Sequence, residues 1–243
     1  MILRPFTAWL HSFLPAAYST SSHISNKERL RSCLGALLGI GVTAAATRLL
    51  LGPEAGLPIP MLIAPMGASA VLLFAVPASP LAQPWALVGG NLVSALSGIT
   101  CARWIGDPLA AAALAVAMSI ALMFWLRCIH PPSGAVALTA VLGGPAIHAL
   151  GYGFVWLPVG LNTLILLAVA IVYHAATRHA YPHRAPLPVA PDRHATLLRA
   201  ELDAVLASRN EVLDVDIGDL QEVLAEVESR MLRRQPEPLR KAA

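Results

Sequence analysis

The sequence predicts an all-α protein: a polytopic bundle of transmembrane helices that is built from two internal repeats. Of the 243 residues, 56% are hydrophobic and only 13% are charged, whereas soluble domains carry roughly a quarter charged residues. Between residues 32 and 177 the chain has just five charged residues: Arg48, Glu54, Arg103, Asp107 and Arg127. This composition excludes a soluble enzyme and indicates a domain that lies within a lipid bilayer.

Residues 1–26 precede the apolar part and predict an amphipathic segment on the membrane surface. A short helix here would be amphipathic, with Phe6 and Trp9 among its apolar residues. A secretory signal is the less favoured alternative, because the apolar stretch is short and broken. Lys27 and Arg29 stand at the head of the first apolar span, so the positive-inside rule places the N-terminus in the cytoplasm.

The transmembrane domain is expected over residues 27–180 and contains four segments of about 20 apolar residues, the length that spans a bilayer. These segments are Ser32–Leu51, Trp85–Ile105, Pro108–Arg127 and Phe154–Thr177. Two of them carry small residues at every fourth position, beginning at Gly35 and at Gly90. Such stripes allow helices to pack closely in lipid, and the sequence also permits them to form the wall of a narrow pore.

Two shorter apolar segments lie between the spans, and prolines interrupt both of them. One segment ends at Pro77, and the other runs from Cys128 to Pro145. A shift of 67 residues aligns Pro65 with Pro132, Gly67 with Gly134, Ala68 with Ala135 and Ala70 with Ala137. The alignment continues, after a small insertion, to Asn91 and Asn162. The chain therefore uses one unit twice, over about 32–105 and 108–177, and the unit is a span, a broken segment and a span.

The sequence allows two paths for the broken segments through the bilayer. Re-entrant segments give four spans and parallel repeats, whereas segments that cross fully give six spans and inverted repeats. We favour six crossings, because segments of about 21 to 23 residues can cross when they are partly extended. Both paths place the C-terminus in the cytoplasm, since the last span runs into Arg178 and Arg184.

The broken segments carry the residues that we expect to form a substrate site. Proline suits the first turn of a helix and prevents a continuous helix through it, so each segment predicts extended chain followed by a short helix. The free N–H groups and the dipole of each helix start favour an anion or a polar group. Two such starts related by a pseudo-twofold axis predict a site near the midplane. Gly67 and Gly134 would let a ligand reach the backbone.

Polar side chains near these starts complete the expected site. His130 can carry a proton near neutral pH, or it can simply form an interhelical hydrogen bond. Asn91 and Asn162 could bond either the backbone of the broken segments, which we favour, or a ligand. Arg127 is either a functional residue or an anchor at the membrane interface. The expected binding or pore residues are His130, Pro131, Pro132, Ser133, Gly134, Pro65, Gly67, Ser69, Asn91, Asn162 and Arg127.

The residues give no support to a metal, a cofactor, an enzyme or a nucleic-acid partner. No second metal-binding side chain lies at ligand spacing from His130, and Cys33, Cys101 and Cys128 are widely spaced. No phosphate-binding glycine loop or nucleophile elbow occurs, so ATP-driven transport and hydrolysis are not expected. The basic residues are scattered, which argues against nucleic acid.

The chain resembles the HPP family of integral membrane proteins at three places. The family's His-Pro-Pro signature is similar to the string RCIHPPSGA from Arg127 to Ala135, and the string APMGAS from Ala64 and the triplet GGN ending at Asn91 extend the resemblance. It covers about residues 28–180. It implies four transmembrane segments and, because plastid and cyanobacterial relatives are implicated in nitrite transport, movement of a small anion.

The resemblance also bears on the tail. Many bacterial members carry a pair of nucleotide-sensing CBS domains, which we expect to be lacking here. Residues 181–195 predict a Pro-rich linker, and residues 196–243 predict a cytoplasmic tail of two amphipathic helices, the second with Leu220 and Leu224 on its apolar face. Two such helices cannot bury a core alone, so we expect them to pack on each other, on a second subunit or on the cytoplasmic face of the membrane domain.

The sequence is consistent with two functions. The first is a transporter or channel for a small inorganic anion such as nitrite, with its site at the starts of the two broken helices. The alternative is a membrane anchor or sensor that transports nothing and acts through its tail. The expected partners are the lipid bilayer, the anion and a second copy of the chain in a homo-oligomer. The expected location is a bacterial inner membrane, with both termini in the cytoplasm.

Overall fold

The computed structural model describes residues 24–51, 62–183 and 214–234, together with 201–202, 204–206 and 208. Within these ranges every regular element is a helix, so the predicted all-α class is confirmed. The expected surface segment within 1–26, the linker from residue 184 and most of the first expected tail helix lie outside the described residues.

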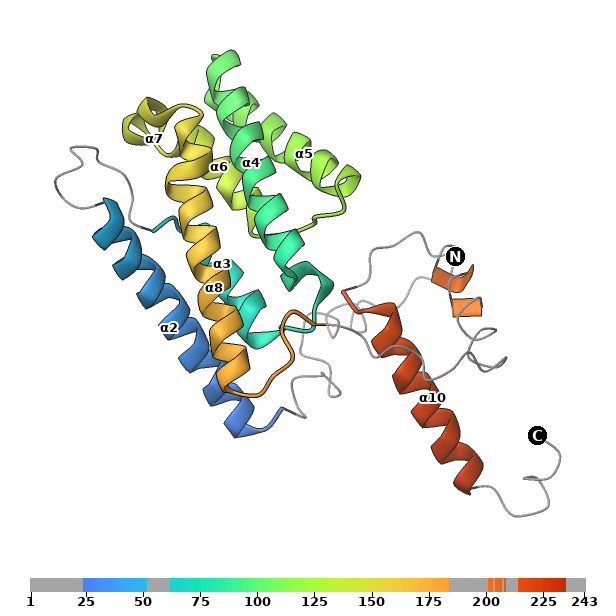
Figure 1. The fold of residues 1–243 in the computed structure, drawn as a ribbon. Coiled ribbons are helices and arrows are strands. Elements are labelled where there is room, and N and C mark those ends of the chain that lie inside the picture. Colours follow the sequence, from blue (N-terminus) through green and yellow to red (C-terminus); the bar gives the residue numbers. More distant parts are fainter. Residues whose placement is uncertain are drawn as a thin grey trace, which may run out of the picture.

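Four helices or helix pairs are long and apolar enough to cross a membrane, as expected. They are α2 (Asn26–Leu51), α4 (Pro84–Trp104), α5 (Pro108–Trp125), and the π-helical η4 (Val155–Gly160) continued by α8 (Leu161–Ala176). The shorter elements are α3 (Pro65–Ala75), the 3-10 turn η3 (Pro80–Ala82), α6 (Ser133–Leu142) and α7 (Pro145–Leu150). The tail contributes α10 (Ile217–Arg234). Figure 1 shows their arrangement.

Contacts at one end of the bundle bring together elements that are distant in the sequence. The Arg31 side chain near the start of α2 donates to the Phe74 carbonyl at the end of α3 (3.3 Å), and Tyr173 on α8 donates to the Arg31 carbonyl (2.7 Å). The Trp85 indole at the start of α4 donates to the Leu126 carbonyl just after α5 (3.0 Å). This end therefore holds the start of α2, the ends of α3, α5 and α8, and the start of α4.

The opposite end holds the end of α4 and the connection before η4. The Arg103 guanidinium lies 5.9 Å from the centroid of the Tyr152 ring. The chain from Leu126 to Tyr152 therefore crosses the bundle, and α6 lies within this crossing. Near the end of α2, Thr47 accepts a hydrogen bond from Asn162 (3.0 Å), so α2 runs away from the first end and α3 returns to it. Each described helix of the second repeat runs opposite to its counterpart in the first, so the two repeats are inverted, which is the arrangement that six crossings of a membrane require (Figure 1).

Each broken helix packs against the closing span of the other repeat. α3 lies against α2 and α8, whereas α6 lies against α5 and α4. The bundle thus consists of two three-helix units, and each unit combines two helices of one repeat with the closing span of the other. The main apolar core includes Leu73, Phe74, Leu87, Phe154 and Leu166.

The two stripes of small residues allow this close packing. A Cβ atom at Gly39 would lie 2.5 Å from the Phe74 ring, so the stripe on α2 receives the end of α3. A Cβ atom at Gly98 would lie 2.7 Å from the Ala137 carbonyl oxygen, so the stripe on α4 receives α6. In this structure both stripes therefore serve helix packing.

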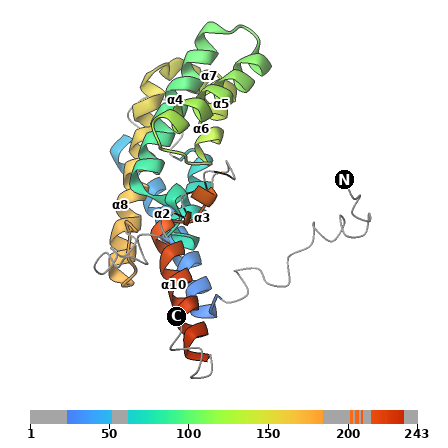
Figure 2. The same ribbon diagram turned by 90° about the vertical axis from the view of Figure 1, so that its right-hand side faces the viewer.

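The tail helix α10 is joined to the end of the bundle that holds Arg31 and the end of α3. The hydroxyl of Ser79, which lies between α3 and η3, donates to Asp214, and His183 pairs with Asp219 on the first turn of α10 (2.8 Å). Burial raises the pKa of Tyr181, whose hydroxyl donates to the Ala82 carbonyl (2.9 Å) near this junction. In both views α10 extends away from this junction along the long direction of the bundle (Figure 1, Figure 2).

Cysteine labelling in intact cells tests the six crossings. With the three native cysteines replaced by alanine, single cysteines are introduced as Lys27→Cys, Gly106→Cys and Arg127→Cys. A membrane-impermeant maleimide either labels a cysteine or leaves it unlabelled. We expect positions 27 and 127 to give the same result and position 106 to give the opposite one, because position 106 lies at the far end of the bundle. Re-entrant segments would instead pair position 106 with position 27 and separate both from position 127, which would contradict this path.

Candidate functional site

The two broken helices begin inside the bundle, at prolines that end a stretch of irregular chain and start a helix. Pro65 occupies the first position of α3, and Pro131 and Pro132 directly precede α6. The fixed dihedral of each proline suits the first helical turn but excludes helix through it. Irregular chain therefore leads into each short helix, as predicted, and its polar groups have to be bonded within the protein.

The backbone N–H groups at these starts are not free, so that expectation is wrong. Met66 and Gly67 each donate to a carbonyl three residues back (3.0 Å). Ser133, Gly134 and Ala135 do the same at 2.9, 3.1 and 3.0 Å. What remains for an anion is the positive end of each helix dipole, which still lies at the helix start.

Asn91 on α4 holds the start of α6. Its side chain is fully buried. The Ser133 hydroxyl donates to its oxygen (2.8 Å), and its amide nitrogen donates to the Thr163 hydroxyl on α8 (3.0 Å). Asn91 belongs to the first repeat and both of these partners belong to the second, so it ties the two repeats together.

Asn162 makes the corresponding bonds from the second repeat to the first. It is fully buried on α8, and its oxygen accepts from the Ile63 backbone N–H just before α3 (3.1 Å). Its amide nitrogen donates to the Thr47 hydroxyl on α2 (3.0 Å). Asn162 thus bonds the backbone of a broken segment, which is the use that we favoured from the sequence, whereas Asn91 bonds the side chains of Ser133 and Thr163.

His130 links the start of α6 to α3 and to the turn before α4. Its Nδ1 lies 2.9 Å from the Leu81 carbonyl oxygen, its Nε2 lies 2.9 Å from the Ser69 hydroxyl, and its side chain is fully buried. A carbonyl oxygen only accepts, so the bonding assigns the proton to Nδ1 and makes Nε2 the acceptor of the Ser69 hydroxyl. This neutral imidazole holds the interhelical hydrogen bond that the sequence allowed.

One face of α3 and the corresponding face of α6 stay uncovered, and we call them together the open face. The shift of 67 residues that aligns the repeats also aligns this exposure. The open face consists of Ala64, Gly67, Ala68 and Val71 at the start of α3, and of Pro131, Gly134, Ala135 and Leu138 at the start of α6; Gly134 is half-buried and the other seven are exposed. A Cβ atom at Gly67 or Gly134 would meet no other atom within 4 Å. The backbone of both helix starts can therefore be reached from this side.

Arg127 does not join these residues. It follows α5 with a positive φ of 53°, its N–H donates to Phe124, and the N–H of Cys128 donates to Met123. This is the Schellman pattern that commonly ends a helix. Arg127 is exposed at the end of the bundle, whereas His130 is fully buried. The position of Arg127 fits an interfacial anchor.

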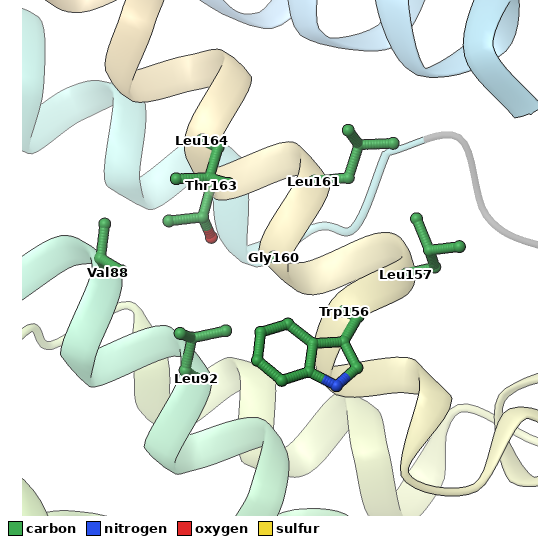
Figure 3. A pocket seen from close by; sticks show the side chains of 8 residues that line it. All are labelled: Val88, Leu92, Trp156, Leu157, Gly160, Leu161, Thr163 and Leu164. Carbon is green, nitrogen blue, oxygen red and sulfur yellow. The ribbon is translucent and has the colours of Figure 1, made fainter.

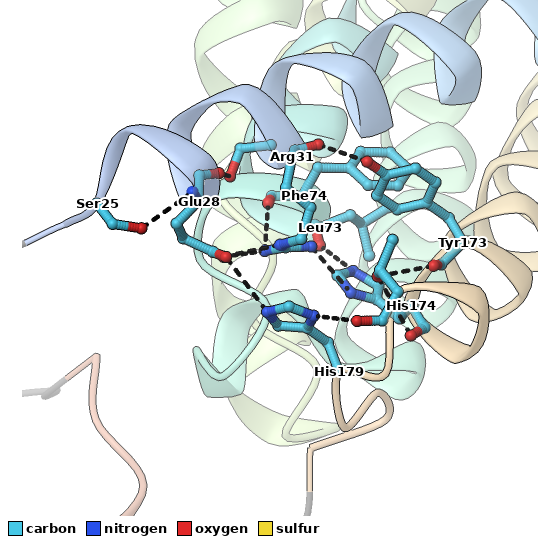
Figure 4. A network of polar contacts seen from close by, with 10 residues as sticks. Ser25, Glu28, Arg31, Leu73, Phe74, Tyr173, His174 and His179 are labelled. Atoms are coloured by element: carbon cyan, nitrogen blue, oxygen red, sulfur yellow. Dashed lines mark hydrogen bonds and ion pairs between the residues drawn. The ribbon is translucent and has the colours of Figure 1, made fainter.

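A buried polar cluster that the sequence did not single out closes the far end of α3 (Figure 4). Arg31, only 8% exposed, is paired with Glu28 and donates to the Phe74 carbonyl. His174 Nε2 lies 2.8 Å from the Leu73 carbonyl, and its Nδ1 lies 3.3 Å from Arg31. Positive charge and N–H donors are favourable at the C-terminal end of a helix. Arg31 and His174 therefore fix the end of α3.

A cavity of about 220 Å³ lies between α4 and the η4–α8 span (Figure 3). Its lining is Val88, Leu92, Trp156, Leu157, Gly160, Leu161, Thr163 and Leu164. The Thr163 hydroxyl is already bonded to Asn91. Such walls suit hydrocarbon better than a small anion. The open face differs from this cavity because it lies at the starts of two helices, where the helix dipoles favour an anion. Among the described residues, no three His, Cys, Asp or Glu side chains gather as metal ligands.

Comparison with known proteins supports one family. Residues 21–182 match the family model described as HPP, transmembrane region. The chain is 39% identical over 127 residues to a transmembrane protein of Dictyostelium discoideum, and 38% identical over 126 residues to another transmembrane protein of that organism. Each alignment covers 50% of this chain, and the aligned parts make up 44% and 40% of the relatives, so the chain spans less than half of their length. No solved structure matches significantly.

The matched region contains both broken helices, all four long spans and the hydrogen bonds that join the two repeats. It also contains the three strings on which the resemblance was based, including the one at His130. The chain therefore belongs to the HPP transmembrane family, and it is a multi-pass integral membrane protein.

Proposed function

We propose that this protein moves a small inorganic anion, nitrite or one like it, across the membrane along the open face. The observation that carries this proposal is the accessible backbone at the starts of two inverted helices: Gly67 is exposed and Gly134 half-buried, and a Cβ atom at either position would meet no other atom within 4 Å. Both helix dipoles direct their positive ends toward the same interior region, where an anion is favoured. Inverted repeats with broken helices near the midplane are a common design of membrane transporters.

In this proposal the predicted residues have two kinds of role. Gly67 and Gly134 border the path, because they leave the helix backbone open to a ligand. Pro65, Pro131 and Pro132 start the helices at the required depth. The polar side chains hold these starts in place rather than bind the ion directly, and they are Ser69, Asn91, His130, Ser133 and Asn162. Arg127 lies outside the path.

The distribution of charge also favours an anion. From residue 55 to residue 191, Asp107 is the only acidic residue in the sequence, so the helices α3, α4, α5, α6 and α8 carry no carboxylate. Arginines stand near both ends of the bundle, with Arg103 at one end and Arg31 and Arg127 at the other. Positive charge at the mouths of a path attracts anions. We propose that the more basic end, which holds Lys27 and Arg178 as well, faces the cytoplasm.

Anion uptake into proteoliposomes tests this function. Purified protein is assayed with nitrite, nitrate, formate and chloride, and we expect uptake of at least one of them. Gly67→Leu and Gly134→Leu should each lower uptake about tenfold or more, because the added side chain narrows the path. Both variants should fold, since a Cβ atom at either position meets no neighbour within 4 Å.

Gly41→Leu is the matched control. Gly41 is also exposed, and a Cβ atom there also meets nothing within 4 Å, but it lies on α2 outside the open face. Uptake by this variant should equal that of the unmodified protein. Absence of uptake for every anion, or equal uptake by all three leucine variants, would refute the proposed path.

The tail helix supports a second candidate function, that of an anchor or sensor for a cytoplasmic partner. On α10 the apolar residues Leu224, Val227 and Met231 are 38%, 48% and 62% exposed. Their spacing places them on one face of the helix. An exposed apolar stripe on an amphipathic helix is a surface that a partner helix or groove can bind.

Substitutions on the two faces of α10 separate the two functions. Leu224→Gln with Val227→Gln should abolish complementation of a deletion strain but leave anion uptake unchanged, because the apolar stripe lies outside the membrane. The control pair Glu222→Gln and Glu226→Gln on the polar face should retain both activities. The second candidate function is excluded if variants that lose anion uptake also lose complementation, while the variant with Leu224→Gln and Val227→Gln still complements the deletion strain.

A further inference from the structure

A cluster of four side chains that carry or take up charge holds the end of α3. We call this cluster the latch, and it consists of Glu28, Arg31, His174 and His179 (Figure 4). Arg31 donates to the Phe74 carbonyl, and His174 lies 2.8 Å from the Leu73 carbonyl, so both bond the last turn of the helix. His174 is fully buried, whereas the side chains of Glu28 and His179 are 34% and 37% exposed. Protons from solution therefore reach the latch from its outer pair.

The hydrogen bonds of His174 assign it as a neutral imidazole. Its Nε2 faces the Leu73 carbonyl oxygen, which only accepts, so Nε2 carries the proton. Its Nδ1 lies 3.3 Å from a guanidinium nitrogen of Arg31, which only donates, so Nδ1 carries none. A second proton on Nδ1 would set two N–H donors and two positive charges against each other. Protonation of His174 therefore breaks its contact with Arg31.

The contacts of His179 fit the opposite charge state. Its Nδ1 lies 3.0 Å from the Thr177 carbonyl oxygen, and its Nε2 lies 3.3 Å from a carboxylate oxygen of Glu28. Both partners are acceptors, so only an imidazolium with two N–H groups satisfies both of them. In the latch as it stands, His179 is already protonated, and mild acid leaves its charge unchanged.

Among the described residues that face His174, no other group changes charge in mild acid. Helix α3 carries no titratable side chain. The rings of Tyr173 and Tyr181 lie 6.1 and 5.1 Å from that of His174, and a phenol stays neutral in acid. Arg31 stays charged, and a glutamate carboxyl such as that of Glu28 ordinarily takes up a proton only at about pH 4.3. His174 is therefore the group that responds to mild acid.

We propose that the latch is a pH-dependent device, which releases the end of α3 when His174 takes up a proton. Once Arg31 is displaced, the Phe74 carbonyl loses its side-chain donor at a helix end where positive charge is favourable. Because α3 has only 11 residues, a free end lets the whole helix tilt, including Gly67 on its first turn. The effect on anion movement rests on the proposed function: a tilted α3 no longer borders the path, and uptake falls.

The end of α6 provides a matched comparison. There the Nε2 of His148 lies 2.8 Å from the Val141 carbonyl, which is the arrangement that His174 makes with Leu73. His148 bonds no arginine among the described residues. A proton on His148 therefore only adds positive charge at a helix end, where such charge is favourable. Mild acid should leave the end of α6 in place.

Electron paramagnetic resonance of spin labels tests the release. On a background without native cysteines, Val76→Cys carries a label just after α3, and Leu142→Cys carries the control label at the end of α6; both native side chains are exposed. Between about pH 8 and about pH 5, the range in which histidine changes charge, we expect the mobile fraction at position 76 to rise about twofold or more. The mobile fraction at position 142 should stay constant. No rise at position 76, or an equal rise at both positions, would overturn the latch.

Two substitutions identify the responding group. His174→Gln keeps an N–H group for Leu73 and an oxygen for Arg31 but takes up no proton, so the acid response at position 76 should disappear. His179→Gln also takes up no proton and should keep the response. A response that survives His174→Gln, or one that only His179→Gln removes, would overturn the assignment to His174. The response of the chain with both native histidines does not depend on the folding of these variants.

Anion uptake at the two pH values separates the latch from the proposed function. We expect uptake by the unmodified protein to fall in acid and uptake by His174→Gln to stay constant. A label response in a protein that takes up no anion would refute the proposed function and leave the latch intact. Uptake that falls in acid without any label response would refute the latch alone.

Discussion

The structure depends on one constraint: a helix that starts inside a membrane bundle needs polar partners at its start. Two buried asparagines supply such partners. A helix that starts within a membrane bundle brings irregular backbone into a region without water, where each unbonded polar group costs several kcal/mol. Asn162 accepts the N–H of Ile63 before α3, and Asn91 accepts the Ser133 hydroxyl at the start of α6. His130 adds a third link between the two starts through Ser69. The two broken helices are thus held by side chains that cross from one repeat to the other.

The exchange of closing spans between the repeats follows from these bonds. Asn91 lies on α4 and bonds partners of the second repeat, while Asn162 lies on α8 and bonds partners of the first. Each asparagine can do so because its span packs beside the helices of the other repeat. The broken helices are therefore fixed on their inner side and bare on their outer side, where Gly67 and Gly134 leave the backbone open. A rigid support behind an accessible backbone is the arrangement that the proposed anion path requires.

Much of this architecture could be predicted from the sequence, because charge depletion and proline spacing are local signals. The shift of 67 residues located both broken helices, and the continuation of the alignment after a small insertion pointed to Asn91 and Asn162. Other features depend on backbone geometry: the N–H groups at the helix starts are used in turns, and Arg127 is directed outward by its helix end. The contact between Arg31 and His174 joins residues 143 positions apart, and no local pattern marks it.

The central claim is that each broken helix is held at its start by an amide from the other repeat. A double-mutant cycle between Asn91→Ala and Ser133→Ala, measured as the free energy of unfolding in bilayers or mild detergent, tests it most directly. We expect a coupling of about 0.6 to 1.5 kcal/mol, the range for one buried hydrogen bond between membrane helices. Strict additivity, within about 0.3 kcal/mol, would contradict the claim, because independent sites add to that precision.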